Sequence, residues 1–339
     1  MAKTSFNRRD FIKSAALAGA GIGLNLSPIA SIAKDISSGK GKRIGIIGLD
    51  TTHSIAFTKA LNDPNAGPEY AGYRVVAAYP YGSRDIELCI KRIPVETEEI
   101  KKYGVKITGS IAQLLKEVDV VLLETNDGRL HLEQALEVLK AGKPLFIDKP
   151  MAASFKDGAA IFKAAEEYKV PVFSSSSLRF MSAIKDVNTG KYGKVTGADT
   201  YSPAYLEKTH TDLFWYGIHG VETLFSVMGP GCKQVTQFSA GDTDVVVGTW
   251  ADNRIGTYRG LRSGKTDFGG TCYCEKEIVQ LGPYVGYAPL LIEIIQFFES
   301  GKPPVSSRET LEILAFMEAA AESKLRGGKP VAMPDFSQL

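Results

Sequence analysis

One lysine of this sequence stands where it could act on a substrate oxygen. Asp148-Lys149-Pro150 follows the short apolar run 144–147. Open α/β sheets bind ligands at the carboxyl ends of their strands, and a lysine there can donate a hydrogen bond to a substrate hydroxyl or carbonyl and stabilise negative charge on its oxygen. The alternative is an ordinary surface lysine. We predict that Lys149 is catalytic and binds the substrate.

His219 is the second candidate for acid–base chemistry. The chain has four histidines, so few side chains compete for the role of a general base near neutral pH. A purely structural histidine is the alternative. His219 and Glu222 could also be two metal ligands on one helical face, but no third ligand follows at a useful spacing, and we predict no metal. Trp215 and Tyr216 could stack on a pyranose ring, although core packing explains them equally well.

The loop before the first predicted helix carries an altered dinucleotide fingerprint. Gly-x-Gly-x-x-Gly lets the backbone approach a pyrophosphate, and here the segment is Gly48-Leu49-Asp50-Thr51-Thr52-His53. Asp50 and His53 replace the second and third glycines. We interpret Asp50 as the N-cap of the following helix. Thr51, Thr52 and the helix N-terminus could still bind an anion, but the fingerprint alone is weak evidence for a cofactor.

The second predicted strand ends without the acidic residue that usually binds a ribose hydroxyl. Its end reads Tyr79-Pro80-Tyr81-Gly82-Ser83-Arg84. Ser83 and Arg84 would tolerate a 2′-phosphate, which favours NADP over NAD. The alternative is a surface turn with a solvated arginine.

A parallel sheet is needed to bring these residues to one edge. Apolar runs alternate with helical spacing in the first half of the chain, which predicts a doubly wound parallel sheet of Rossmann type. Beyond about Ser175, β-rich segments with Gly, Asn and Asp turns predict a mostly antiparallel open sheet, closed by helices that pack back. Asp252-Asn253 is a plausible hairpin tip. The predicted strands are 42–48, 74–79, 120–123, 144–147, 170–173, 195–201, 234–240, 244–250, 255–261 and 271–279, and the helices are 54–61, 131–141, 156–168, 290–298 and 308–324.

The composition excludes several classes of protein. The 339 residues are 44% hydrophobic and 23% charged, which is typical of a globular protein and not of a disordered chain or a polytopic membrane protein. Forty basic and 38 acidic residues give a net charge of +2, so we expect no nucleic-acid partner. The length predicts two domains after an N-terminal signal: an α/β domain over 34–175 and an α+β domain over 176–339.

The first 33 residues are predicted to be an export signal. Asn7-Arg8-Arg9-Asp10-Phe11-Ile12-Lys13 precedes an uncharged run that is too weakly apolar to span a membrane and ends in Ser31-Ile32-Ala33. This pattern resembles a bacterial twin-arginine signal. We expect cleavage after Ala33, a periplasmic location and no membrane span in the mature chain, with an uncleaved anchor as the alternative. The mature chain would have 36 basic and 37 acidic residues, so that its net charge is −1.

The order of these motifs resembles the glucose–fructose oxidoreductase / inositol dehydrogenase (Gfo/Idh/MocA) family over nearly all of the mature chain. The motifs are Gly48, Asn126 and His131 before the helix to Ala141, Ala141-Gly142-Lys143-Pro144, Asp148-Lys149-Pro150 and Gly217-Ile218-His219. The resemblance implies nicotinamide-dependent oxidation or reduction of a sugar or cyclitol hydroxyl, with Lys149 and His219 as the catalytic pair. It implies that NAD or NADP is held tightly, with Thr125, Asn126, His131, Asp148 and Lys149 adding to the two loops described above.

The chain departs from this family at three places. The fingerprint is altered at Asp50 and His53, and the family's Glu-Lys-Pro is Asp148-Lys149-Pro150. Trp215 stands where the family usually has the aspartate that orients its histidine. Asp212 or Glu222 could take over that role.

We therefore expect an exported oxidoreductase that acts on a sugar, glycoside or cyclitol hydroxyl by hydride transfer. By analogy with such folds we also expect an oligomer of identical chains. Two alternatives remain open. One is oxidation followed by elimination, which would hydrolyse or cleave a glycoside with the same bound cofactor. The other is a non-catalytic carbohydrate-binding relative that has lost dinucleotide binding.

Overall fold

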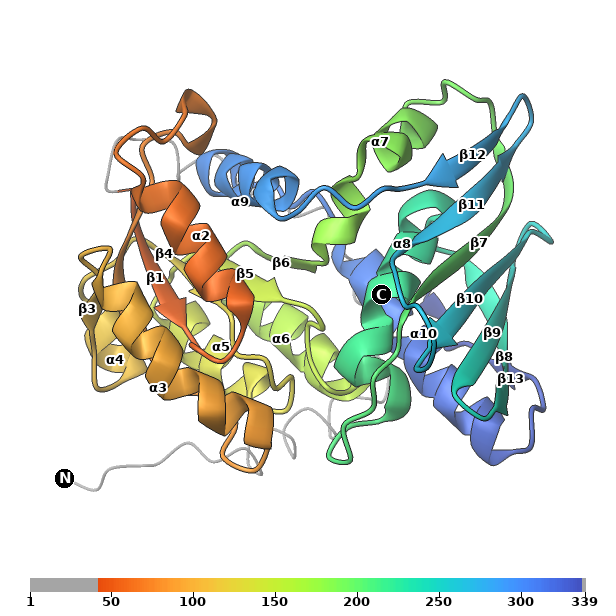
Figure 1. Cartoon of the computed structure of the whole chain (residues 1–339), viewed down its shortest axis with the longest axis horizontal. Helices are drawn as coiled ribbons and strands as arrows, with labels where there is room; N and C mark the ends of the chain where they lie inside the picture. Colours follow the sequence, from red (N-terminus) through yellow and green to blue (C-terminus); the bar gives the residue numbers. More distant parts are fainter. Residues whose placement is uncertain (1–41, 337–339) are drawn as a thin grey trace.

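The computed structural model of the protein describes residues 42–336, so the predicted export signal and its cleavage site lie outside the described residues. Two β-sheets with their own helices occupy the two halves of the molecule (Figure 1). No helix within residues 42–336 is long and apolar enough to cross a membrane. The fold class predicted from the sequence, a Rossmann α/β domain followed by an α+β domain, is confirmed.

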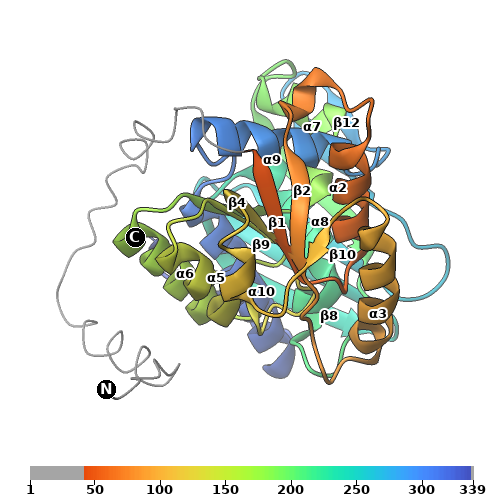
Figure 2. The same ribbon diagram turned by 90° about the vertical axis from the view of Figure 1, so that its left-hand side faces the viewer.

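The first sheet has six parallel strands in the order β3-β2-β1-β4-β5-β6. Its elements are β1 (Arg43–Ile47), α2 (Thr52–Asn62), η2 (Pro68–Tyr70), β2 (Arg74–Tyr79), α3 (Glu87–Lys101), β3 (Lys106–Ile107), α4 (Ile111–Leu114), β4 (Val120–Leu123), α5 (His131–Lys140), β5 (Leu145–Asp148), α6 (Phe155–Tyr168) and β6 (Val172–Ser175). Strands β4, β5 and β6 are buried along their whole length, as expected where helices cover both faces. Figure 2 shows α2 and α3 on one side of the sheet and α5 and α6 on the other.

The second sheet has seven strands in the order β12-β11-β7-β10-β9-β8-β13. Its neighbouring strands are antiparallel, except that β10 runs parallel to β7. The remaining elements are η3 (Ser177–Phe180), α7 (Ser182–Asn188), β7 (Val195–Pro203), η4 (Leu213–Gly217), α8 (Ile218–Met228), β8 (Cys232–Ala240), β9 (Thr243–Trp250), β10 (Ile255–Leu261), β11 (Gly269–Cys274), β12 (Ile278–Leu281), α9 (Ala288–Ser300), α10 (Ser307–Leu325) and β13 (Val331–Ala332).

Two local features of the second sheet test the sequence interpretation. The turn between β9 and β10 contains Asn253 at φ 66°, so the predicted hairpin tip is confirmed. The predicted strand 271–279 is wrong as a single element, because residues 275–277 form a turn between the antiparallel strands β11 and β12.

Helix α3 of the first domain was not predicted from the sequence. It is mostly exposed and contains Pro94, so it lacks a strong apolar stripe.

Helix α8 is buried along its whole length between the second sheet and the helical elements η3, α7 and α10. It approaches the sheet closely because Gly220 has no side chain: a Cβ at this position would lie 2.1 Å from the ring of Tyr258 on β10. This close packing sets the position of His219, the next residue toward the N-terminus of the helix.

Two C-terminal helices tie the domains together. Helix α10 packs against β8 of the second sheet and against α6 of the first domain. Helix α9 buries Leu290, Leu291, Ile294, Ile295, Phe297 and Phe298 in the core formed by one face of the first sheet and helices α2 and α3. That face over β4, β5 and β6 is therefore covered by a helix that follows β6 by more than one hundred residues of sequence.

Candidate active site

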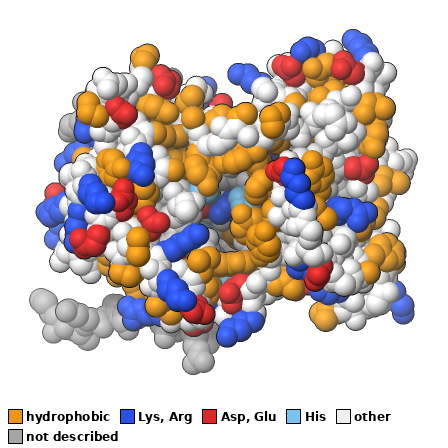
Figure 3. All heavy atoms as spheres, in the orientation of Figure 1, with side chains coloured by type: hydrophobic (Ala, Val, Ile, Leu, Met, Phe, Trp, Pro, Cys, Tyr) orange, Lys and Arg blue, Asp and Glu red, His pale blue; other side chains and the backbone are white. Residues whose placement is uncertain are grey.

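A cavity of about 190 Å³ lies where the two domains meet. Figure 3 shows a hollow between the two halves, with basic and histidine side chains at its floor and hydrophobic side chains around it. The first domain contributes Thr51, Thr52, His53, Asn126 and Lys149 to its wall. The cavity thus collects predicted residues from the ends of β1, β4 and β5, which is the edge where this class of sheet binds ligands.

The second domain contributes the predicted Trp215, Tyr216 and His219, together with aromatic residues that the sequence did not single out. Phe268 and Tyr284 come from the segments that flank β11 and β12. These rings make one wall of the cavity apolar, while the opposite wall carries hydroxyl, amide and amine groups. Such a cavity suits a small polyol, whose ring faces are apolar and whose hydroxyls need hydrogen bonds.

Lys149 is a buried cation at the floor of this cavity. Its Nζ atom lies 3.0 Å from Asp148 Oδ2, and the side chain is 8% exposed. Burial alone would lower the pKa of Lys149, but Asp148 and, next, Glu124 outweigh this effect, so its pKa is raised and the amine stays charged. A charged amine donates hydrogen bonds and cannot accept a proton, so Lys149 can stabilise negative charge on a substrate oxygen.

His219 is held by Ser176, which follows β6. The Ser176 hydroxyl lies 2.8 Å from His219 Nδ1, which leaves Nε2 for a group in the cavity. Burial is the main cause that lowers the pKa of His219 well below its ordinary value of 6.5, and Lys149 adds to it. The imidazole is therefore neutral near pH 7 and able to accept a proton.

The two carboxylates expected to orient His219 are engaged elsewhere, so this expectation is wrong. Asp212 pairs with Lys324, and Glu222 pairs with the buried Arg179. The hydroxyl of Ser176 orients His219 instead. Ser176 was not predicted because it lies in a run of four serines, and only the tertiary structure shows which of them meets the histidine.

Asp50 is not the N-cap of α2, contrary to our interpretation of the sequence. Thr51 is the N-cap, and its side chain accepts a hydrogen bond from the backbone of His53. The buried Asp50 carboxylate instead accepts hydrogen bonds from the backbone N–H groups of Asn126 (2.9 Å) and Ser83 (3.3 Å). Asp50 therefore joins the loops that follow β1, β2 and β4. Burial raises its pKa, although these hydrogen bonds oppose the shift.

A second contact joins two of these loops, those that follow β2 and β4. Arg129, in the β4–α5 loop, binds Asp85 in the β2–α3 loop through Nη2 at 2.6 Å and Nη1 at 3.1 Å. The Ser83 hydroxyl donates a hydrogen bond to Asp85, and the Arg84 guanidinium lies over the ring of Tyr81. Neither Ser83 nor Arg84 lines the cavity.

Four other residues predicted to bind the cofactor make close contacts within the protein. Gly48 has φ 93°, and a Cβ there would lie 2.4 Å from the Thr125 nitrogen, so this glycine lets the β1 and β4 loops meet. His131 is fully buried, with its ring nitrogens 2.6 Å from the Thr125 carbonyl and 3.2 Å from the Met151 carbonyl. Asp148 is also fully buried and acts through Lys149 and His53. Gly48, Thr125, His131 and Asp148 do not line the cavity.

Glu124 completes a cluster with His53 and Asp148 that the sequence did not reveal. His53 Nδ1 lies 3.0 Å from Asp148 Oδ2 and 3.8 Å from Glu124 Oε2. Burial raises the pKa of Glu124 well above its ordinary value, with Asp148 adding to the shift. Burial alone would also raise the pKa of Asp148, but His53 and Lys149 outweigh it and lower the pKa overall.

The two ends of the predicted dinucleotide site differ in this structure. Thr51 and Thr52 at the start of α2, where this fold binds the pyrophosphate, face the cavity together with Asn126 and Lys149. On this fold the ribose of the adenosine half lies near the end of the second strand. That region is filled here by the Asp50 side chain and spanned by the Arg129–Asp85 pair. These contacts therefore lie across the region where the adenosine ribose is expected.

Comparison with known proteins identifies the first domain. Residues 42–176 match the GFO_IDH_MocA family model, described as an oxidoreductase family with an NAD-binding Rossmann fold. The predicted family resemblance is confirmed for this domain.

The individual relatives match parts of the chain or its fold. An uncharacterized oxidoreductase of Streptococcus pneumoniae is 27% identical over 149 residues, which are 42% of this chain and 40% of that protein. The 1,5-anhydro-D-fructose reductase of Ensifer adhaerens is 31% identical over 94 residues, 26% of this chain and 28% of the reductase. The chain thus spans less than half the length of these curated relatives. A crystal structure of Lactobacillus casei scyllo-inositol dehydrogenase with bound NAD(H) and scyllo-inositol shares the fold over 86% of this chain and 99% of that chain, with a TM-score of 0.71 and 14% identity.

Proposed function

We propose that this protein, whose Rossmann domain matches the Gfo/Idh/MocA oxidoreductases, is a nicotinamide-dependent oxidoreductase that acts on a hydroxyl group of a small sugar, glycoside or cyclitol. The observation that carries the proposal is the juxtaposition of a charged lysine and a neutral histidine in one small cavity with an aromatic wall. The likeness to a sugar reductase and an inositol dehydrogenase supports the choice of substrate class.

The chain's own residues account for the proton side of such a reaction. Lys149 would donate a hydrogen bond to the substrate oxygen and favour its ionisation. His219 Nε2 would take the hydroxyl proton, while Ser176 holds the ring by Nδ1. When bound, the nicotinamide ring supplies the acceptor for the hydride that leaves the same carbon. The aromatic wall would exclude water and place one face of the sugar ring.

The direct test is substrate-dependent reduction of the cofactor. Purified full-length protein is incubated with NAD⁺ or NADP⁺ and a panel of cyclitols, hexoses and glycosides, and the near-ultraviolet absorbance of reduced nicotinamide is followed. An increase with one polyol supports the proposal. Protein that neither carries nor reduces a dinucleotide with any of them contradicts it. If a glycoside is cleaved and no reduced nicotinamide accumulates, the reaction is oxidation followed by elimination.

The pH profile of the reaction should report the low pKa of His219. We expect kcat/KM for oxidation to be flat from about pH 8 down past pH 6.5 and to fall only below that range, because His219 must bind a proton before it stops acting as a base. His219→Gln should lose this acid limb and about 10²–10⁴ in kcat/KM. An acid limb that persists unchanged in the variant would assign the base to another group.

A second candidate function is favoured by the contacts that cross the expected adenosine region. Asp50 and the Arg129–Asp85 pair suit a carbohydrate-binding relative that no longer takes a dinucleotide. If these contacts alone prevent binding, Asp50→Gly should lower the Kd for NAD⁺ at least tenfold in calorimetric titration. Arg129→Ala should also lower this Kd. Asp50→Gly should also cost about 1–3 kcal/mol of stability, since two buried N–H groups lose their acceptor.

Arg84→Ala is the matched control, because Arg84 lies on Tyr81 outside the cavity and its removal should leave NAD⁺ affinity unchanged. If wild type and both opened variants all fail to bind NAD⁺ or NADP⁺ while the protein still binds a sugar, the second candidate is correct.

We also propose that the protein acts outside the cytoplasm. The twin-arginine segment ahead of a weakly apolar run and Ser31-Ile32-Ala33 supports this proposal. N-terminal sequencing of the protein from the periplasmic fraction tests it, with Lys34 expected as the first residue.

A further inference from the structure

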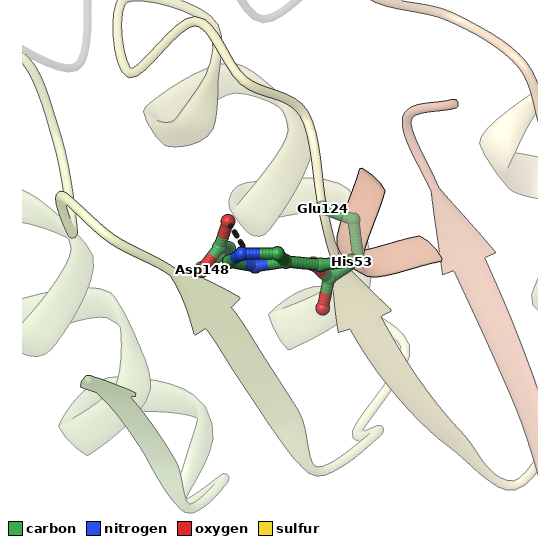
Figure 4. A group of neighbouring side chains, drawn as sticks. All are labelled: His53, Glu124 and Asp148. Atoms are coloured by element: carbon green, nitrogen blue, oxygen red, sulfur yellow. Dashed lines mark ion pairs between the residues drawn. The ribbon is translucent and has the colours of Figure 1, made fainter. Parts of the chain in front are cut away.

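We propose that His53, Glu124 and Asp148 bind a divalent transition-metal ion at the floor of the cavity. The three side chains come from the start of α2 and from the ends of β4 and β5, and they lie next to one another (Figure 4). One nitrogen and two carboxylate oxygens, one from each residue, all lie within 4.8 Å of one another. This proposal concerns ion binding and stands whether or not a dinucleotide binds.

The hydrogen bonds of this cluster are incomplete. Both carboxylate oxygens of Glu124 and Oδ1 of Asp148 are buried without a hydrogen-bond partner, while His53 Nδ1 lies 3.0 Å from Asp148 Oδ2. Glu124 is fully buried, so no bulk water reaches its oxygens. Buried polar groups are nearly always satisfied, and buried charges are paired or coordinate metals. One ion would satisfy all three side chains at once.

The charges of the cluster also call for a cation. Asp148 and Glu124 carry two potential negative charges, and Lys149 pairs with Asp148 Oδ2 but supplies a single positive charge. With both acids ionised, one negative charge remains for a further cation to balance. The unpartnered oxygens of Glu124 are the buried atoms that such a cation would meet.

The spacing of the ligand atoms matches coordination by a small ion. Zn²⁺ binds imidazole nitrogen and carboxylate oxygen at about 2.0–2.2 Å, which places neighbouring ligand atoms about 3–3.5 Å apart. The observed separations are 3.0 Å from His53 Nδ1 to Asp148 Oδ2 and 3.8 Å from His53 Nδ1 to Glu124 Oε2. One imidazole and two carboxylates suit Zn²⁺ or Mn²⁺ better than the softer copper(I) ion, which prefers sulfur.

Three protein ligands leave a coordination position open, which is typical of metal sites that bind a substrate. His53 lines the cavity, so that position would be reached from the polyol site. A hydroxyl oxygen bound there would meet the metal and Lys149 together, and both lower the cost of negative charge on it. The site would thus select vicinal or ring hydroxyl groups that can coordinate a cation.

Metal content and binding test the proposal without any dinucleotide or sugar. Untagged full-length protein is purified without chelator, analysed by inductively coupled plasma mass spectrometry, and titrated after chelation with Zn²⁺ and with Mn²⁺. We expect one ion per chain and a Tm at least about 5 °C higher at saturating Zn²⁺. Glu124→Gln and His53→Ala should lose at least nine-tenths of the bound metal and the Tm increase.

Glu222→Gln is the matched control, because Glu222 is a buried glutamate that pairs with Arg179 outside the cluster. It should keep the metal. Co²⁺ added to wild-type protein gives a readout that does not depend on folding of any variant: visible absorption bands of low-symmetry nitrogen and oxygen ligation are expected. Folded wild type that binds no metal, a Co²⁺ spectrum equal to that of the free ion, or variants that hold as much metal as wild type would overturn the proposal.

Discussion

Replacing Lys149 by methionine is expected to lower kcat/KM for the polyol substrate by about 10²–10³, the loss seen when one donor to a developing oxyanion is removed. Lys149 supplies the ammonium group at the floor of the cavity, and it is held in place by Asp148 at 3.0 Å. Methionine fills a similar volume without the charge. The measurement is steady-state turnover with the substrate found in the cofactor-reduction assay.

The same substitution removes the cation that faces two buried carboxylates, so its effect on folding must be measured beside its effect on turnover. Breaking a buried ion pair from one side costs about 3–5 kcal/mol. Urea unfolding shows whether the variant is folded at the assay temperature, and Lys149→Arg keeps the charge with different donor geometry. Lys156→Met, at an exposed position on α6, should leave turnover unchanged. A folded Lys149→Met variant within tenfold of wild type would remove Lys149 from the reaction.

Replacing Arg179 by methionine should lower the free energy of unfolding by about 3–5 kcal/mol. Arg179 lies in η3 and is 10% exposed. It donates from Nε to Glu222 on α8 at 2.9 Å and from Nη1 to Glu309 on α10 at 2.6 Å. Without it, two acidic side chains lose their partner at the junction of three elements.

The loss should depend on pH in a defined direction. Burial raises the pKa of Glu222 even with Arg179 present. A buried glutamate with a raised pKa binds its proton more readily in the folded than in the unfolded protein, so stability increases as the pH falls through the range between the two pKa values. The destabilisation by Arg179→Met should therefore be greater at pH 8 than at pH 5. Urea unfolding followed by circular dichroism at both values measures it.

Arg43→Met provides the matched comparison. Arg43 also binds a carboxylate, Asp119, at 2.9 Å, but its side chain is 52% exposed. Solvent screens that pair, and its removal should cost less than about 1 kcal/mol. Equal losses in the two variants would mean that burial does not set the strength of these pairs.

The fold could be predicted because its periodicities are local. Strand β2, strand β4 and the hairpin of β9 and β10 each carry their pattern within a few residues, and their alternation with helical spacing leads to the Rossmann topology. The elements that were missed lack such a pattern. Helix α3 is mostly exposed, and the turn between β11 and β12 lies within one continuous β-forming segment.

A residue of the site could be predicted only where its position at a strand end or in a motif was enough to indicate its role. Lys149 and His219 were found in this way, and the structure places both on one cavity. Ser176 and Glu124 could not be found, because their importance comes from what the tertiary structure brings to them. Asp50 shows the opposite case: a helix cap was the simplest local interpretation, and distant backbone N–H groups proved to be its partners.

Helix α9 has a consequence for how the chain is made. The Rossmann sheet is complete at Ser175, yet part of one face is covered only by residues 288–300. A ribosome that adds about 5–20 residues per second completes the segment of α9 several seconds after that of β6. During this interval the apolar side chains of Phe146 and Phe173 on the nascent chain have no native cover. The N-terminal domain therefore depends on synthesis of the C-terminal one, and the two must mature as a single unit.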